Sequence, residues 1–278
     1  MIDDHSHQPR SRTRRRFEVA YRVASSLGLA ADESPRGHLM FRSFLFVALF
    51  SFMNLAFANP GSKEMASGEM ANIQTFVSHR DGKPVTVGIR IPGSLLTSLP
   101  GNSSSVAVNL PSAVPPFDHV QLDWNPQGHM PDGIYNLPHF DVHFYTISRE
   151  ARADISCHGA DLVNCEKRPE DRLIPKGYVP TPGGEPSMGA HWINPLSPEF
   201  NGERFTHTLI YGFYKGQMTF IEPMITTEFL LSHNDVAIPV AQPMGVVDPG
   251  FYPTLYTVRW LSVADVYEIS LDGLVQRQ

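Results

Sequence analysis

Apolar and polar residues alternate along several short segments of the chain, which is the pattern of strands that bury one face. In HVQLDW, residues 119–124, His119, Gln121 and Asp123 fall on one face and three apolar residues on the other. HFDVHFYTI, residues 139–147, repeats this pattern. Further strands are predicted at residues 84–91, 106–110, 204–214, 216–224, 252–260 and 265–271.

Helical patterns are few and short. GSLLTSLPG, residues 93–101, predicts one or two helical turns ended by proline and glycine. TTEFLLSH, residues 226–233, predicts a short helix with Thr226 or Thr227 as its N-cap. Residues 214–216, YKG, indicate a hairpin turn between two strands. We therefore predict an all-β or β-rich α+β fold, an antiparallel barrel or sandwich with a few short helices.

The N-terminal part differs in composition from the rest. Residues 1–58 hold eight of the 22 basic residues, all of them Arg, and five of the 28 acidic ones. The remainder has 14 basic and 23 acidic residues, a charge of about −9. Residues 40–58 combine Arg42, the apolar run 44–55 and the small-residue site AFA, which is the layout of a secretory signal peptide. The run is shorter than the roughly 20 residues of a membrane span, and an uncleaved anchor is the alternative.

These features divide the chain into four parts. Residues 1–39 are interpreted as a disordered leader, or as a misassigned start that precedes Met40. The mature protein is predicted to begin at Asn59, with residues 59–83 as an N-terminal lead-in, loose over residues 59–72, and residues 84–278 as a single β-rich domain. The predicted location is exported, periplasmic or secreted, with no stable membrane insertion after cleavage. The acidic mature part argues against a nucleic-acid partner.

The two cysteines fit the same compartment. Cys157 and Cys165 lie in a polar stretch, CHGADLVNC, with no second cysteine pair for a zinc ribbon. In an oxidising compartment they predict a disulfide that closes a local loop. Zinc binding together with His158 is the weaker alternative.

Chemically useful side chains gather on one face of the strand predicted at 139–147. Alternation places His139, Asp141, His143 and Tyr145 together on that face. The aromatic and apolar residues between them must be buried on the other face. The polar face lies either against bulk water or against a lined cavity.

Three other segments supply groups of the same kind. SMGAHW contains His191, and the turn WNPQGH contains His129. FIEPM sets Glu222 among large apolar side chains, where a free carboxylate would be costly to bury without a cation or a donor. Imidazoles with one carboxylate are the usual ligands of zinc, iron, manganese or copper. We predict a site for such a divalent metal. Its predicted ligands are His139, His143, His191 and Glu222, with Asp141, His129 and Tyr145 as orienting groups or alternative ligands.

The geometry of a strand leaves two versions of this site. On a straight strand His139 and His143 are about 13 Å apart at Cα, from a rise of about 3.3 Å per residue. They share one ion, with bonds of about 2.0–2.1 Å, only if the strand bends after Pro138. On a straight strand His139 and Asp141 form an H-x-D pair with His191 as third ligand. A hydrogen-bonded polar cavity without metal and a plain solvated face are the alternatives.

A long string of motifs resembles a known family. PFDHVQLDWNPQGHMPDGIYNLPHFDVHFY, followed by MGAHW, SPEFNG, IYGFY and FIEPM, is similar to a family of exported bacterial proteins of unknown function. The structural type of that family is a ring-forming Thermus protein. The resemblance runs through most of residues 84–272 and implies a β-rich domain that assembles into a homo-oligomeric ring. It implies no reaction. The cysteine loop and the leader before Met40 lie outside the resemblance.

Three functions fit these observations. The first is an exported metalloprotein, in which an ion with an open position activates water or polarises a carbonyl. The second is a non-catalytic oligomeric envelope scaffold. The third is a barrel that binds a small-molecule ligand. The sequence contains no G-x-S-x-G and no H-E-x-x-H motif, so common hydrolase classes have no support. Whether the protein is an enzyme is left open.

Overall fold

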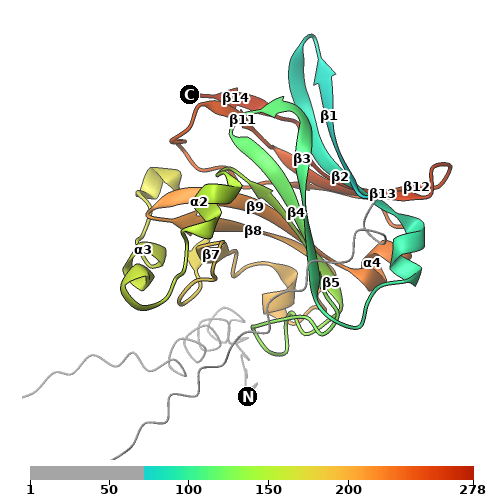
Figure 1. Cartoon of the computed structure of the whole chain (residues 1–278), viewed down its shortest axis with the longest axis horizontal. Coiled ribbons are helices and arrows are strands. Elements are labelled where there is room, and N and C mark those ends of the chain that lie inside the picture. Colours follow the sequence, from blue (N-terminus) through green and yellow to red (C-terminus); the bar gives the residue numbers. More distant parts are fainter. Residues whose placement is uncertain (1–71) are drawn as a thin grey trace, which may run out of the picture. The chain divides into compact units, whose positions relative to one another are not determined.

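Two antiparallel sheets pack face to face in the computed structural model, which describes residues 72–278 (Figure 1). The predicted signal peptide and the alternative start at Met40 lie outside the described residues. Within residues 72–278 the strands form open sheets rather than a closed barrel. The β-rich fold class is therefore confirmed in its sandwich form.

The first sheet has five strands in the order β1-β2-β13-β12-β10. Apolar residues of neighbouring strands face each other in register, for example Ile89 of β2 opposite Ile269 of β13. An Asp-Gly turn, Asp81 and Gly82 with positive φ, joins the first two strands as a hairpin. The strands are β1 Gln74–Arg80, β2 Lys83–Pro92, β10 Val236–Pro239, β12 Leu255–Leu261 and β13 Val266–Asp272.

The second sheet has seven strands in the order β3-β4-β5-β9-β8-β7-β6. Its central strand β5 is buried at all seven positions, so both faces of the sheet are covered there. Pro223 of β9 offers no N–H, yet the ladder between β5 and β9 continues on both sides of it. The strands are β3 Ser104–Val114, β4 Phe117–Asn125, β5 His139–Tyr145, β6 Val179–Pro180, β7 Ala190–Ile193, β8 His207–Tyr214 and β9 Gln217–Thr226. A small third sheet pairs β11 Gly250–Tyr252 with β14 Val275–Arg277.

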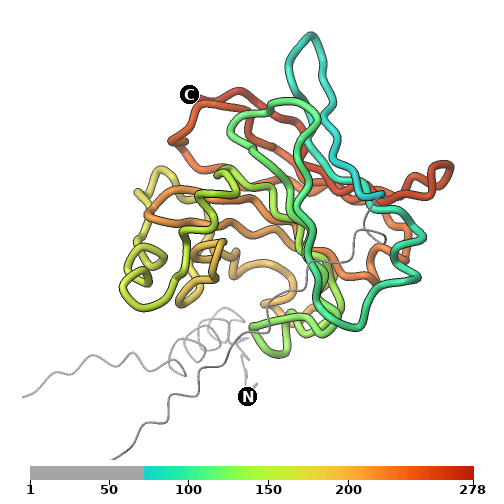
Figure 2. Tube along the Cα trace, viewed as in Figure 1, coloured from blue at the N-terminus to red at the C-terminus, as the bar shows by residue number. Residues whose placement is uncertain are grey.

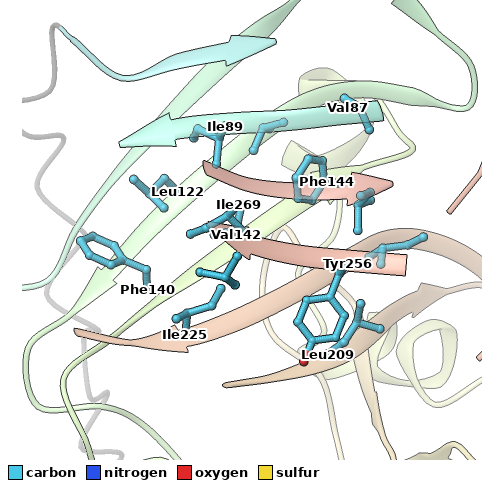
Figure 3. Packing of buried hydrophobic residues seen from close by; sticks show 14 of the residues in the cluster. Val87, Ile89, Leu122, Phe140, Val142, Phe144, Leu209, Ile225, Tyr256 and Ile269 are labelled. Atoms are coloured by element: carbon cyan, nitrogen blue, oxygen red, sulfur yellow. The ribbon is translucent and has the colours of Figure 1, made fainter. Parts of the chain in front are cut away.

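The main hydrophobic core lies between the two large sheets (Figure 3). Phe140, Val142 and Phe144 of β5 enter it from one side, and Ile89 and Ile269 from the other. Burial of such side chains contributes about 1.5–3 kcal/mol each, which makes this layer the chief source of stability. The alternation predicted for residues 139–147 is thus confirmed over residues 139–145.

Short helices and loops cover the other face of the seven-stranded sheet. Figure 2 follows the yellow-green segment after β5, which gathers beside the hairpin of β8 and β9. Cys157 and Cys165 form the predicted disulfide in this segment. A second apolar cluster of Tyr135, Phe205 and Met224 covers the sheet further along.

The helical elements of residues 72–278, on either face, are η1 Gly93–Thr97, α2 Arg149–Ala153, η2 Gly159–Asp161, α3 Leu162–Cys165, η3 Asp171–Leu173, η4 Pro198–Asn201 and α4 Thr227–Leu231.

Two differences from the sequence interpretation concern boundaries. β1 lies within residues 59–83, the stretch predicted as a lead-in to the β-rich domain, because the Asp-Gly turn returns the chain into a hairpin. β3 continues to Val114, beyond the end at residue 110 that the sequence predicts. The short helices at 93–97 and 227–231 occur where predicted, the latter capped by the Thr226 hydroxyl. Among residues 72–278 no helix is long and apolar enough to cross a membrane.

Candidate metal site on the histidine face

The seven-stranded sheet turns a row of polar side chains away from the main core, which we name the histidine face. It comprises the outward residues of β4, β5, β7 and β9. Strand pairing aligns them across the sheet, with Gln121 opposite His143 and Asp123 opposite Asp141. These residues are His119, Gln121, Asp123, Asn125, His139, Asp141, His143, Tyr145, His191, Phe220 and Glu222.

Most of this face is buried, although the outward face of an antiparallel sheet usually meets water. His139 is fully buried, Glu222 is 2% exposed, and His143 and Asp141 are buried as well. Buried polar groups normally have hydrogen-bond partners. Here His139 Nε2, Asp141 Oδ1, both ring nitrogens of His143 and Glu222 Oε2 have none.

Three ligating side chains meet at one end of the face, a set that we name the outer triad: His129, His139 and Asp141. Asp141 Oδ1 lies 3.1 Å from His139 Nε2, and Asp141 Oδ2 lies 3.3 Å from His129 Nε2. Asn125 donates a 2.7 Å hydrogen bond to Asp141 Oδ2. Burial alone raises the pKa of Asp141, but His139 and His129 outweigh it and lower that pKa overall.

A second set, which we name the inner triad, comprises His143, His191 and Glu222. Glu222 Oε2 lies 3.3 Å from His143 Nε2 and 4.0 Å from His191 Nε2. The Phe220 ring packs against both imidazoles. Burial, followed by the charges of Asp141 and Asp123, raises the pKa of Glu222 well above its usual value. Burial, followed by the charges of His143 and His129, lowers the pKa of His191 to about 3.

A carboxylate supports the inner triad from the neighbouring strand. Asp123 Oδ2 lies 3.0 Å from His143 Nδ1, on the ring edge away from Glu222. Gln121 donates hydrogen bonds of 2.8 and 3.0 Å to the Asp123 carboxylate and holds it in place. A carboxylate behind an imidazole is the usual partner of a metal-binding histidine, because it orients the ring and increases its basicity.

The structure brings the predicted residues together in two places instead of one. β5 pairs with β4 without a bulge from His139 to Tyr145, so the bent version of the site does not occur. His139 and Asp141 lie together as the H-x-D pair expected of a straight strand, but the third member of that set is His129. His191 instead lies with His143 and Glu222.

Tyr145 belongs to neither triad. Its ring stacks on His119 and lies 3.7 Å below the Arg152 guanidinium carbon, and its hydroxyl reaches the carbonyl of Ser187. Arg152 also contacts His119 Nε2 at 2.9 Å. Sequence reasoning did not single out Arg152, because one arginine in a polar helix carries no signal of burial. Asp123 was placed on the right face by alternation, but nothing in the sequence paired it with His143.

Comparison with known proteins finds one family. Residues 80–124 match the model of the TTHB210-like family, described as hypothetical protein TTHB210. The chain resembles this family. The match confirms the predicted resemblance over β2, β3 and β4, and it includes Gln121 and Asp123 but neither triad. No curated protein and no solved structure matches the chain.

Proposed function

We propose that this protein is an exported metalloprotein that holds a divalent transition-metal ion in the inner triad. The observation that carries the proposal is Glu222, a buried carboxylate whose Oε2 has no hydrogen bond and faces two imidazole nitrogens. An isolated buried carboxylate is unfavourable, and a cation bound to it offsets that cost. Two imidazoles and one carboxylate form the facial set typical of open metal sites.

The separation between His143 and Glu222 fits two ligands of one ion, and His191 Nε2, 4.0 Å from Glu222 Oε2, would have to approach that carboxylate more closely to complete the set. With bonds of about 2.0–2.1 Å, neighbouring ligand atoms lie about 2.9 Å apart at a right angle and about 3.3 Å apart at the tetrahedral angle. His143 Nε2 and Glu222 Oε2 are 3.3 Å apart. In the competing arrangement, an imidazolium at His143 would donate to Asp123 and Glu222. That arrangement needs a hydrogen bond from His143 Nε2 to Glu222, and this contact lacks hydrogen-bond geometry, whereas the Nδ1 contact with Asp123 is common to both arrangements.

Three protein ligands leave at least one position for water or a small ligand. An ion there lowers the pKa of bound water and polarises oxygen atoms, which is the chemistry of metal-assisted hydrolysis. Phe220 packs against both imidazoles, and the burial of His143 and Glu222 strengthens electrostatic interactions with a bound group. The Cys157–Cys165 disulfide supports the exported location, since such bonds persist in oxidising compartments.

The test is metal analysis of untagged protein purified from the exported fraction. Wild type is compared with Glu222→Gln and with Glu268→Gln. Glu268 is a matched control because it is a buried carboxylate of the other sheet, bound to Arg90. We expect Glu222→Gln to lose one ion per chain and Glu268→Gln to retain it. Equal metal content in both variants would contradict the proposal.

A further inference from the structure

The two imidazoles of the outer triad have the same tautomer, which their backbone contacts fix. His139 Nδ1 lies 2.6 Å from the carbonyl of Leu137, and His129 Nδ1 lies 2.8 Å from the carbonyl of Met130. A carbonyl oxygen only accepts, so in both rings Nδ1 carries the proton. In the neutral rings Nε2 then presents a lone pair, and both Nε2 atoms point to the carboxylate of Asp141.

The Nε2 lone pairs of His139 and His129 face oxygens of Asp141 at 3.1 and 3.3 Å. Each lone pair repels the oxygen that it faces unless a cation lies between them. A metal ion satisfies both nitrogens and the carboxylate at once.

The distances between the ligand atoms, and the hydrogen bonds that orient the ligands, both fit a preformed metal site. Both contacts fall within the range of about 2.9–3.3 Å expected between neighbouring ligands of one ion. Each imidazole is oriented by a backbone carbonyl, and Asp141 is oriented by the Asn125 amide, so each ligand has the partner that metal-binding side chains usually have. His139 Nε2 and Asp141 Oδ1 are buried without hydrogen bonds.

We propose that the outer triad is a second metal site, distinct from the inner triad, which binds a divalent transition metal such as zinc in exchange with solvent. Exchange follows from exposure. The His129 side chain is 39% exposed, whereas the most exposed side chain of the inner triad, His191, is 18% exposed and His143 and Glu222 are nearly inaccessible. The two sites therefore differ in how fast they release an ion, even though both use two imidazoles and one carboxylate.

The loop that carries His129 is anchored at its far end by Tyr135, which is buried beside Phe205 and donates a hydrogen bond to Glu199, whereas His129 itself is held by local bonds. His129 N–H donates to the carbonyl of Tyr135, and Gly128 adopts a positive φ with the backbone of Tyr135 directly beside it. A bound ion links this loop to β5 through His129 and His139. Metal binding at the outer triad therefore protects the loop from proteolysis, an effect that filling the inner triad does not produce.

The test is a titration of metal-free, full-length exported protein with Zn²⁺ in competition with a chromophoric chelator. The variants are His129→Ala, Asp141→Asn and His191→Ala, and His158→Ala serves as the control because it removes an exposed histidine of the cysteine loop. Wild type is expected to bind two ions, one released to chelator at least 100-fold faster than the other. His129→Ala and Asp141→Asn should lose the fast ion, and His191→Ala the slow one.

The outcomes separate the two proposals. If wild type binds a single fast ion that His129→Ala loses and His191→Ala retains, the outer site stands and the inner site fails. If His129→Ala keeps the stoichiometry and release rates of wild type, the outer site is refuted. The same holds if Zn²⁺ leaves proteolysis of the loop at residues 126–138 unchanged while one slow ion binds, which is the outcome expected if Asp141 forms only ion pairs with the imidazoles.

Discussion

Replacement of Glu222 by Gln in metal-free protein distinguishes a metal ligand from a partner in an ion pair. Gln has nearly the same shape as Glu, so the packing against Phe220 and His143 is retained while the carboxylate is removed. If Glu222 forms a structural pair with a His143 imidazolium, the change breaks a buried pair and costs about 3–5 kcal/mol. If Glu222 is a metal ligand, the change removes a buried carboxylate that has no partner in metal-free protein. The free energy of unfolding is then unchanged or increased by about 1–3 kcal/mol.

The assay is urea denaturation followed by tryptophan fluorescence at pH 8, first with a chelator and then with Zn²⁺. For a domain of this size, 1 kcal/mol corresponds to roughly 2–4 °C in Tm, so thermal unfolding provides a second measurement. Wild type should gain about 2.7 kcal/mol at a free Zn²⁺ concentration 100 times the Kd, and Glu222→Gln should gain less. A loss of 3 kcal/mol or more by Glu222→Gln in chelator would refute our reasoning.

Three further predictions follow from other contacts. Gly212→Ala should weaken the inner triad without unfolding the protein, because a Cβ there would meet the Phe220 ring that packs on His143 and His191; a titration with wild-type affinity would count against this. Cys165→Ser should lower the free energy of unfolding, measured in urea, by about 2–3 kcal/mol. That is the stabilisation that the chain-entropy model gives for a disulfide closing so short a loop. Burial lowers the pKa of His119 more than the Asp118 hydrogen bond raises it. The unfolded chain therefore binds a proton more readily than the folded protein, so the free energy of unfolding decreases as pH falls through 6.5. His119→Gln should reduce this acid-side loss in unfolding measured from pH 7.5 to 5, and an unchanged slope would show that other groups cause it.

The sequence predicted the strands of the sandwich because alternation is a local property. Each residue of β5 faces the side that its position in HFDVHFY requires, so the core members and the histidine face could both be read from one segment. The Asp-Gly pair of the β1–β2 hairpin is a local signal of the same kind. The choice between barrel and sandwich depends on which edge strands pair, and no local pattern specifies that.

The candidate site was predicted less completely, because it depends on loops. Straight-strand geometry correctly places His139 with Asp141 and separates His139 from His143. It cannot decide which imidazole from elsewhere joins each carboxylate. That choice is made by the path of residues 126–138, which brings His129 to Asp141, and by the pairing of β7 with β8, which brings His191 to Glu222. The homo-oligomeric ring and a small-molecule ligand stay predictions, and light scattering of the exported protein would test the ring.

The strand at the centre of the second sheet serves two layers at once, with even-numbered residues in the core and odd-numbered residues on the histidine face. This separation makes the two roles independently adjustable over evolution. Exchanges at 139, 141 or 143 would change the proposed metal ligands, while 140, 142 and 144 keep the core side chains that stabilise the fold. Side chains of the histidine face can therefore be exchanged during evolution at little cost to the stability of the sandwich.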